Sequence, residues 1–190
     1  MEILTAKKEN IKKIVGSIAE GKVIVVPTDT VYGLVCDASN KEAVERIFSI
    51  KKRDKSKSLL VFVKDIEAAK DLALVNEKEE EFLRDNKTTV ILEAKDKTLS
   101  PLVYKDDTIG VRIPRYEFLN LILEGFKKPL AQTSANISRG LTTTRIKEVL
   151  EIFRSQDIQP DIILNVGNLS KNKPSKIVDL SRNREEVLRY

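Results

Sequence analysis

Apolar residues recur at helical spacing near the start of the chain and then form a short unbroken run. Positions three and four apart predict an amphipathic helix over about residues 8–20, ended by Gly21. The run Val23–Val26 predicts a strand that is buried on both faces. Asn40 is placed to cap a second amphipathic helix, and residues 59–63 predict the next strand. The chain therefore begins in a strand, helix, strand order.

The later patterns continue this alternation. Helical spacing covers residues 65–72, 77–84, 116–124 and 143–153, the last with a threonine as its cap. Strand-like runs cover residues 88–93, 109–113, 162–165 and 176–180. Leu130 leads into residues 133–136, whose turn chemistry predicts a polar loop. The pattern predicts an α/β (α+β-like) fold, a single domain over residues 1–190 with helices flanking a twisted sheet of mixed parallel and antiparallel strands.

The composition is that of a folded protein outside the membrane. Of the 190 residues, 41% are hydrophobic and 33% charged, with a net charge of +5, whereas disordered chains combine low hydrophobicity with high net charge. No apolar run approaches the roughly 20 residues of a membrane span, and the first residues lack the build of a signal peptide. We therefore expect a cytoplasmic protein. A basic balance of this size suits a nucleic acid, a nucleotide, a phosphorylated metabolite, or solubility alone.

The chain has no histidine and a single cysteine, Cys36. One cysteine cannot form an internal disulfide, and without histidine the usual zinc site cannot be assembled. Catalysis by a Ser-His-Asp or Cys-His arrangement is excluded for the same reason. Cys36 is expected to be a small buried hydrophobic residue.

Two polar segments follow the first predicted strand and the second predicted helix. In VVPTDTVYGL, Thr28, Asp29 and Thr30 can cap a short helix through Tyr32, and such a helix start can also hold an anion. The second segment, IKKRDKSKSLL over residues 50–60, is either a solvated charged face or a clamp for phosphate or carboxylate groups.

Two further polar segments accompany later strands. In DTIGVRIPRY, strand alternation places Thr108, Gly110 and Arg112 on one face, which suits a pocket wall or an exposed sheet face. PLAQTSANISRG, residues 129–140, suits close contact with a ligand or an ordinary loop. Neither G-x-x-x-x-G-K-[ST] nor G-x-G-x-x-G is present. The residues alone therefore predict a basic, polar anion site that contains no histidine.

Taken in order, five segments resemble the YrdC-like family. They are Pro27–Leu34, Ile47–Arg53, Thr108–Pro114, Thr133–Ser138 and Pro174–Leu180. They span nearly the whole chain, and an end soon after the last predicted strand resembles the short, single-domain form of the family. The resemblance implies a twisted sheet with a concave, positively charged cavity.

The resemblance also implies a reaction. L-Threonine, bicarbonate and ATP, the last with Mg²⁺, would give L-threonylcarbamoyl-AMP and pyrophosphate, which is the activity of a nucleotidyltransferase. The product would pass to a separate tRNA threonylcarbamoyl transferase complex that modifies adenosine 37 of tRNA. Direct contact with tRNA is left open, and no membrane partner is expected.

The family pattern can be carried onto this chain residue by residue. It implies that L-threonine is bound by Thr30, Phe62, Arg112, Ser134 and Ser175. It implies that ATP is bound by Arg53, Lys57, Thr108, Asn136, Thr144 and Arg189. Lys51 and Arg53 would neutralise the phosphates as the catalytic pair, Asp29 is the one candidate for a general base, and no protein metal ligands are implied.

Several positions depart from the family pattern. Asp54 and Ser58 stand where prolines are common, Phe62 where a histidine is often found, and Lys176 where a threonine follows the serine. These departures leave three alternatives: a YciO-like paralogue, a protein of the same fold that binds double-stranded RNA or tRNA, and a carbamoyl-transfer enzyme for another amine. The aromatic content of 5% and the absence of RRM-like or KH-like motifs argue against RNA binding.

Overall fold

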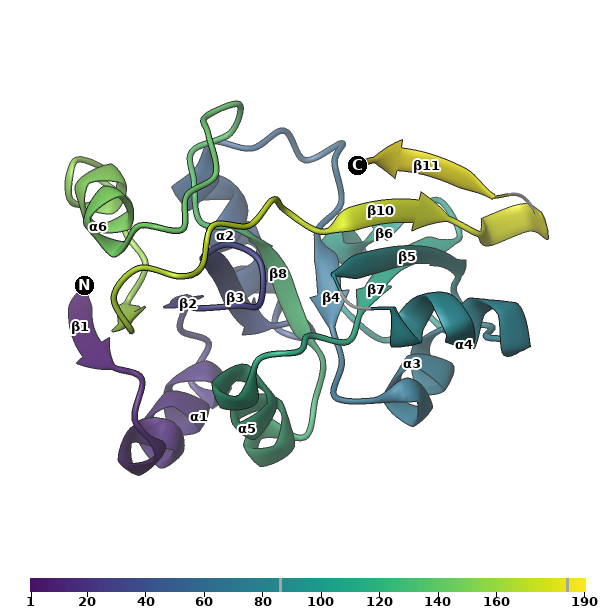
Figure 1. Cartoon of the computed structure of the whole chain (residues 1–190), viewed down its shortest axis with the longest axis horizontal. Helices are drawn as coiled ribbons and strands as arrows, with labels where there is room; N and C mark the ends of the chain where they lie inside the picture. Colours follow the sequence, from purple (N-terminus) through teal and green to yellow (C-terminus); the bar gives the residue numbers. More distant parts are fainter. Residues whose placement is uncertain (86, 184) are drawn as a thin grey trace.

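The strands form one mixed sheet. The computed structural model describes residues 1–85, 87–183 and 185–190. Its strands are β1 (Glu2–Thr5), β2 (Ile24–Val26), β3 (Gly33–Asp37), β4 (Leu60–Phe62), β5 (Thr88–Glu93), β6 (Tyr104–Lys105), β7 (Thr108–Arg112), β8 (Leu130–Ser134), β9 (Ile162–Asn165), β10 (Lys176–Asp179) and β11 (Glu186–Arg189). They are ordered β1-β9-β2-β3-β8-β4-β7-β5-β10-β11, with β6 paired to β7 (Figure 1). The pairs β1–β9, β2–β9, β4–β7 and β5–β10 are parallel, and the others are antiparallel.

The helices begin at the capping residues that the sequence suggests. They are α1 (Ile11–Ala19), α2 (Lys41–Lys51), α3 (Ile66–Leu72), α4 (Glu77–Arg84), α5 (Glu117–Phe126) and α6 (Ile146–Arg154). Asn40 Oδ1 accepts a hydrogen bond from the Ala43 amide at 2.9 Å, which confirms the predicted cap of α2. The predicted α/β class with a mixed sheet flanked by helices is confirmed.

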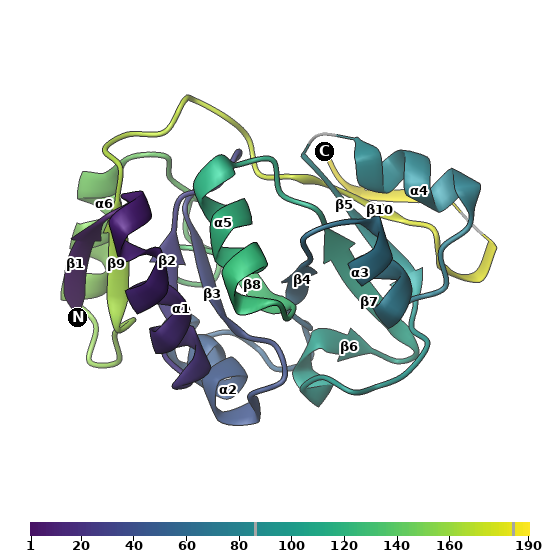
Figure 2. The same ribbon diagram turned by 90° about the horizontal axis from the view of Figure 1, so that it is seen from below.

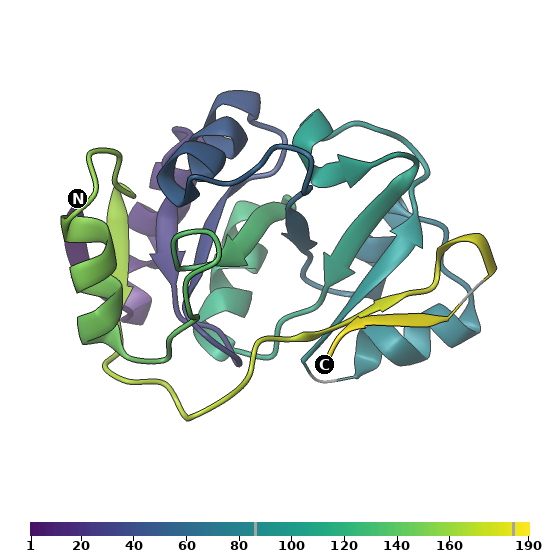
Figure 3. The same cartoon turned by 90° about the horizontal axis from the view of Figure 1, so that it is seen from above.

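The two faces of the sheet are covered differently. Helices α1 and α5 lie side by side on one face (Figure 2), where they pack against β2 and β9 in the smaller apolar cluster. Helices α2, α3, α4 and α6 contribute to the larger core cluster on the other face. The hairpin of β10 and β11 forms the edge of the sheet opposite β1 (Figure 3).

Strand alternation places the polar residues of the sheet centre on the face that carries α1 and α5. Val61, Val111 and Ala131 belong to the larger core cluster. Their neighbours Arg112 and Gln132 therefore point to the opposite side, where they line a cavity beyond α5. The fold thus leaves a hollow on a face that is otherwise filled by helices.

Three predictions about secondary structure are wrong. The short helix through Tyr32 does not form, because the Thr28 hydroxyl accepts from the Thr30 amide in a local turn and β3 starts at Gly33. The loop expected after Leu130 is strand β8, which pairs with β3 and β4. The last long helix begins at Ile146, since the Thr143 hydroxyl accepts from the Arg145 amide one turn earlier.

Two predictions about burial can be compared with the structure. Cys36 is fully buried in the core, as predicted, and burial raises the pKa of its thiol. In the described residues, no helix combines the length and the apolar character needed to cross a bilayer.

Candidate active site

Two neighbouring cavities lie at the centre of the sheet and beside it. The first has a volume of about 310 Å³ and is lined by strands β4, β7, β8 and β11 and by the loop between β2 and β3. The second, of about 380 Å³, lies where α2 ends. Arg53, Lys57 and Ser134 line both cavities, so the two form adjoining parts of one site.

The hydroxyl groups of the loop between β2 and β3 form a chain of hydrogen bonds with a fixed direction. Thr28 Oγ1 donates its single proton to the Val31 carbonyl at 2.7 Å. In the 3.0 Å contact between Thr28 and Thr30 the Thr30 hydroxyl must then be the donor. Thr30 Oγ1 also accepts from Arg112 Nη1 at 3.2 Å. What remains to Thr30 is a lone pair, which suits an ammonium or hydroxyl donor of a ligand.

Arg112 is the buried cation of the first cavity. Strand β7 brings its side chain beneath the loop, where it is 3% exposed and where Nη2 donates to Asp29 Oδ1 at 2.7 Å. The guanidinium carbon lies 5.8 Å from the ring centre of Phe62, its partner across β4 and β7. Burial lowers the pKa of Arg112, and the Asp29 carboxylate opposes this shift. Guanidinium geometry suits a carboxylate or phosphate ligand.

Lys51 ties the end of α2 to the segment that follows β8. Its side chain is buried, and Nζ donates to the Ser134 carbonyl at 2.6 Å, the Asn136 carbonyl at 2.8 Å and Asn136 Oδ1 at 2.7 Å. The Ser134 hydroxyl donates to the same Asn136 oxygen at 2.8 Å. Since an ammonium has three donors, the structure uses them all. Lys51 therefore fixes the two polar residues that line the second cavity.

The pKa of Lys51 predicts a pH-dependent stability. Burial, and to a lesser extent Arg53, lower this pKa from 10.5 to about 7. The folded protein then loses this proton before the unfolded chain does, so the free energy of unfolding should rise between about pH 7 and pH 10.5. Urea unfolding of the wild type and of Lys51→Met across this range measures the effect. The stability difference between the two proteins should increase with pH, and a difference that stays constant would contradict the shift.

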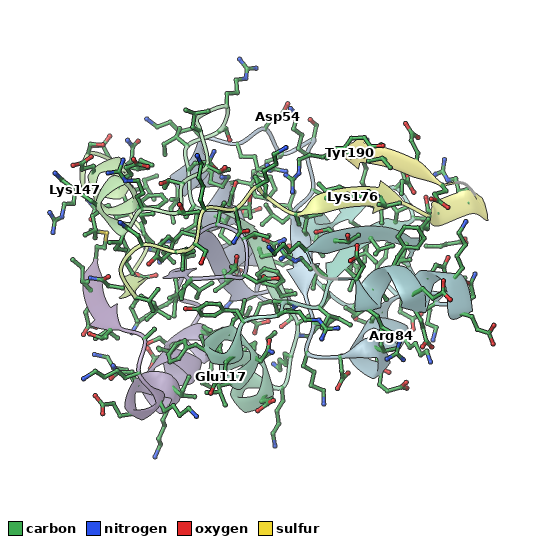
Figure 4. The ribbon with its side chains drawn as sticks, viewed as in Figure 1. Asp54, Arg84, Glu117, Lys147, Lys176 and Tyr190 are labelled. Atoms are coloured by element: carbon green, nitrogen blue, oxygen red, sulfur yellow. The ribbon has the colours of Figure 1, made fainter. Side chains whose placement is uncertain are left out.

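Arg53 shapes the loop that follows α2. The helix ends at Lys52 in the left-handed conformation, with φ of 50°, and the Arg53 amide turns back to donate to the Phe48 carbonyl at 3.0 Å. Arg53 Nε donates to the Lys57 carbonyl at 2.9 Å and Nη2 to the Ser58 carbonyl at 3.0 Å. Asp54 lies on this loop (Figure 4) and is the one acidic residue among those described that line the second cavity.

Ser175 and Arg189 close the first cavity from the far side of the sheet. Arg189 Nε and Nη2 donate to the Ser175 carbonyl at 2.9 and 2.7 Å, and Nη2 also donates to Ser175 Oγ at 3.1 Å. Burial and the charge of Arg112 lower the pKa of Arg189. Lys176 lies over the ring of Tyr190 at 5.7 Å, and both are labelled in Figure 4.

Most of the residues assigned from the sequence come together at these cavities. The first is lined by Thr30, Arg53, Lys57, Phe62, Arg112, Ser134, Ser175 and Arg189, and the second by Lys51, Arg53, Lys57, Ser134 and Asn136. Two assigned residues lie apart from both linings. Thr108 is at the other end of β7 from Arg112 and donates to the Lys105 carbonyl, and Thr144 precedes α6. The roles given to all these residues stay predictions.

Other cavity residues were not identified from the sequence. Gln132 lines the first cavity because it lies two residues before Ser134 on β8, and the alternation would have found it had β8 been predicted as a strand. Lys105 lines the first cavity and Arg139 the second. Gly110 faces the side chain of Leu60 instead of a ligand, since a Cβ at Gly110 would lie 2.5 Å from Leu60 Cδ2.

Comparison with known proteins gives a family match over most of the chain. Residues 17–190 match the model of the family Sua5_yciO_yrdC, which is described as "Telomere recombination". A threonylcarbamoyl-AMP synthase of Pseudoalteromonas translucida is 33% identical over 145 residues, which cover 73% of this chain and 78% of that protein.

Solved structures share the fold. The crystal structure of Pyrococcus abyssi Sua5 complexed with L-threonine superimposes with a TM-score of 0.90 at 28% identity. The match covers all of this chain, which spans 57% of the Sua5 chain. Escherichia coli YciO matches with a TM-score of 0.85 at 24% identity over 99% of this chain and 93% of that chain, a likeness of fold alone.

Proposed function

The chain belongs to the Sua5/YciO/YrdC family, and on this premise we propose that it is an enzyme that makes L-threonylcarbamoyl-AMP. The substrates would be L-threonine, bicarbonate and ATP, and the second product would be pyrophosphate. This reaction classifies the enzyme as a nucleotidyltransferase. The relative from P. translucida is named for this product, and the Sua5 structure holds L-threonine.

The observation that carries the proposal is the chemical difference between the two adjoining cavities. The first offers a buried guanidinium at Arg112 beside an acceptor lone pair at Thr30. These groups complement the carboxylate and the ammonium of an amino acid. The second cavity gathers Lys51, Lys52, Arg53, Lys57 and Arg139, which suits a polyphosphate. The site therefore has one end for an amino acid and one end for a nucleotide.

The proposed reaction needs positioning and charge neutralisation more than acid–base chemistry. The amine of threonine reacts with bicarbonate to a carbamate, and a carbamate oxygen attacks the α-phosphate while pyrophosphate leaves. Cations that are fixed before the reaction stabilise the charge that develops on the phosphates without reorganising. Arg53 is held by two loop carbonyls and can serve in this way. The catalytic role of Lys51 would be largely indirect, because its donors hold Ser134 and Asn136.

Mg²⁺ is proposed to enter as part of the ATP substrate. The described residues contain no group of three or more His, Cys, Asp or Glu side chains that could hold a metal ion. Asp54 is the one carboxylate at the phosphate end, and a Mg²⁺ ion with few protein ligands is usual when phosphates and water complete its shell. The cytoplasmic setting and the transfer of product to a tRNA-modifying complex are further parts of the proposal.

Pyrophosphate release tests the proposed function. With ATP and Mg²⁺, release should require both L-threonine and bicarbonate and should be much slower with L-serine. An Arg53→Ala variant should lose most of this activity, about tenfold or more, because it removes a charged contact of the phosphate end. Release that ignores threonine while ATP still binds would favour a paralogue with another amine substrate.

A further inference from the structure

A buried carboxylate lies behind Arg112 and has no part in the proposed reaction. Asp29 Oδ1 accepts from Arg112 Nη2 at 2.7 Å, and the two side chains are 8% and 3% exposed. Arg112 and Thr30 line the first cavity, whereas Asp29 is absent from its lining within the described part of the chain. A ligand in this cavity would therefore contact Arg112 and would not reach Asp29.

We infer that Asp29 is a positioning residue, which fixes the Arg112 guanidinium and thereby makes the amino-acid end of the cavity select substrates that carry a carboxylate. This inference rests on the proposed function, because it requires that Arg112 receives the carboxylate of the substrate. It assigns to Asp29 a role in orientation instead of proton transfer.

The contacts around Arg112 hold the guanidinium plane from three directions. Asp29 accepts from Nη2, Thr30 accepts from Nη1 at 3.2 Å, and the Phe62 ring lies 5.8 Å from the central carbon. Of these three contacts, Asp29 alone supplies negative charge. Thr30 is itself fixed by its bond to Thr28, so the two oxygens that orient Arg112 come from one rigid loop.

The ion pair is made by one nitrogen and one oxygen only. Arg112 Nε and Asp29 Oδ2 are both buried and have no hydrogen-bond partner among the described residues. An arginine and a carboxylate often pair through two parallel hydrogen bonds, which would also occupy Nε. Because Asp29 holds Nη2 alone, donors of the guanidinium remain for a second anion.

The charge of Asp29 also balances a concentration of cations. Arg112 lowers the pKa of Arg189, so the two guanidinium groups act on each other across the first cavity. A buried charge that loses its partner is strongly disfavoured. Without the negative charge of Asp29, the Arg112 side chain would move toward solvent, and the carboxylate site would lose its geometry.

The test compares L-threonine with L-threoninol, in which a CH₂OH group replaces the carboxylate. Binding of each ligand is measured in the wild type, in Asp29→Asn and in a matched control, Asp37→Asn. Asp37 is similarly buried at 7% exposure, but it accepts from Ser39 at the far end of β3. The Asp29→Asn variant should bind L-threonine about tenfold more weakly, the loss expected when a charge-assisted contact is impaired. Its affinity for L-threoninol and for ATP should stay within about threefold of the wild type, a change of less than 1 kcal/mol.

The outcomes separate this inference from the proposed function. Equal weakening of L-threonine and L-threoninol in Asp29→Asn, or an Asp37→Asn variant with the same loss for L-threonine, overturns the positioning role. A wild type that binds ATP but no L-threonine overturns the proposed function, and the inference falls with it.

A measurement on the wild type keeps the inference testable if Asp29→Asn does not fold. Arginine side-chain NMR should show hindered rotation of the Arg112 guanidinium before any ligand is added, with the signal assigned through Arg112→Lys. Free rotation of this group in the wild type would contradict a positioning role for Asp29.

Discussion

Replacement of Arg112 by lysine should raise the KM for L-threonine about 100-fold, while the KM for ATP changes little. The guanidinium bonds to Asp29 and Thr30 at the same time, and it has further donors for a ligand. A lysine keeps the positive charge beside Asp29 but cannot contact both residues and a carboxylate in one plane. Loss of a charged, two-point contact is worth up to about 3 kcal/mol, which corresponds to the 100-fold effect.

Arg115→Lys is the matched control for this variant. Arg115 follows the same strand, but it is exposed and donates to the Arg84 carbonyl at 3.0 Å, away from the cavity. Steady-state kinetics with threonine and ATP varied separately should show wild-type values for Arg115→Lys. If Arg112→Lys behaved like this control, Arg112 would have no role in holding the amino acid.

Replacement of Lys51 by methionine should lower both stability and activity. Methionine keeps the apolar stem but leaves the Ser134 and Asn136 oxygens without their donor. Buried acceptors that lose a partner cost about 1–3 kcal/mol, which lowers Tm by about 5–10 °C in a chain of this size. Pyrophosphate release should fall at least about tenfold even below the melting range, because Ser134 and Asn136 would lose their fixed geometry.

Lys55→Met provides the comparison for Lys51→Met. Lys55 lies in the adjacent loop, and its ion pair with Glu45, at 3.5 Å, is exposed to solvent. Exposed pairs contribute about 0–1 kcal/mol, so the Tm and the activity of Lys55→Met should match the wild type. An equal loss in both variants would mean that general surface charge matters and that the bonds of Lys51 do not.

Local signals in the sequence were sufficient to predict the helices that carry the site. Asn40 and Asp65 cap α2 and α3 as their side chains suggest, because each accepts a bond from an amide three residues later. The alternation in β7 likewise placed Arg112 opposite the apolar residues of the core. These features depend on near neighbours in the chain, so they are legible from one sequence.

The features that were missed depend on contacts between distant segments. Strand β8 contains Gln132, Thr133 and Ser134, whose polar side chains favour a loop. Pairing with β3 and β4 on both sides overrides this preference. The bonds of Lys51 to Ser134 and Asn136 cross more than eighty residues of sequence. A basic cluster alone does not reveal whether a lysine faces a phosphate or holds the loop beside it.

The most direct test of the proposed reaction is the fate of the bicarbonate carbon. The enzyme is incubated with ATP, Mg²⁺, L-threonine and ¹³C-labelled bicarbonate, and the nucleotide products are separated and weighed by mass spectrometry. The account predicts a product that contains AMP, threonine and one labelled carbon, formed in equal amount to pyrophosphate and absent when threonine is omitted. Release of AMP or ADP without threonine and without the labelled carbon would contradict the account.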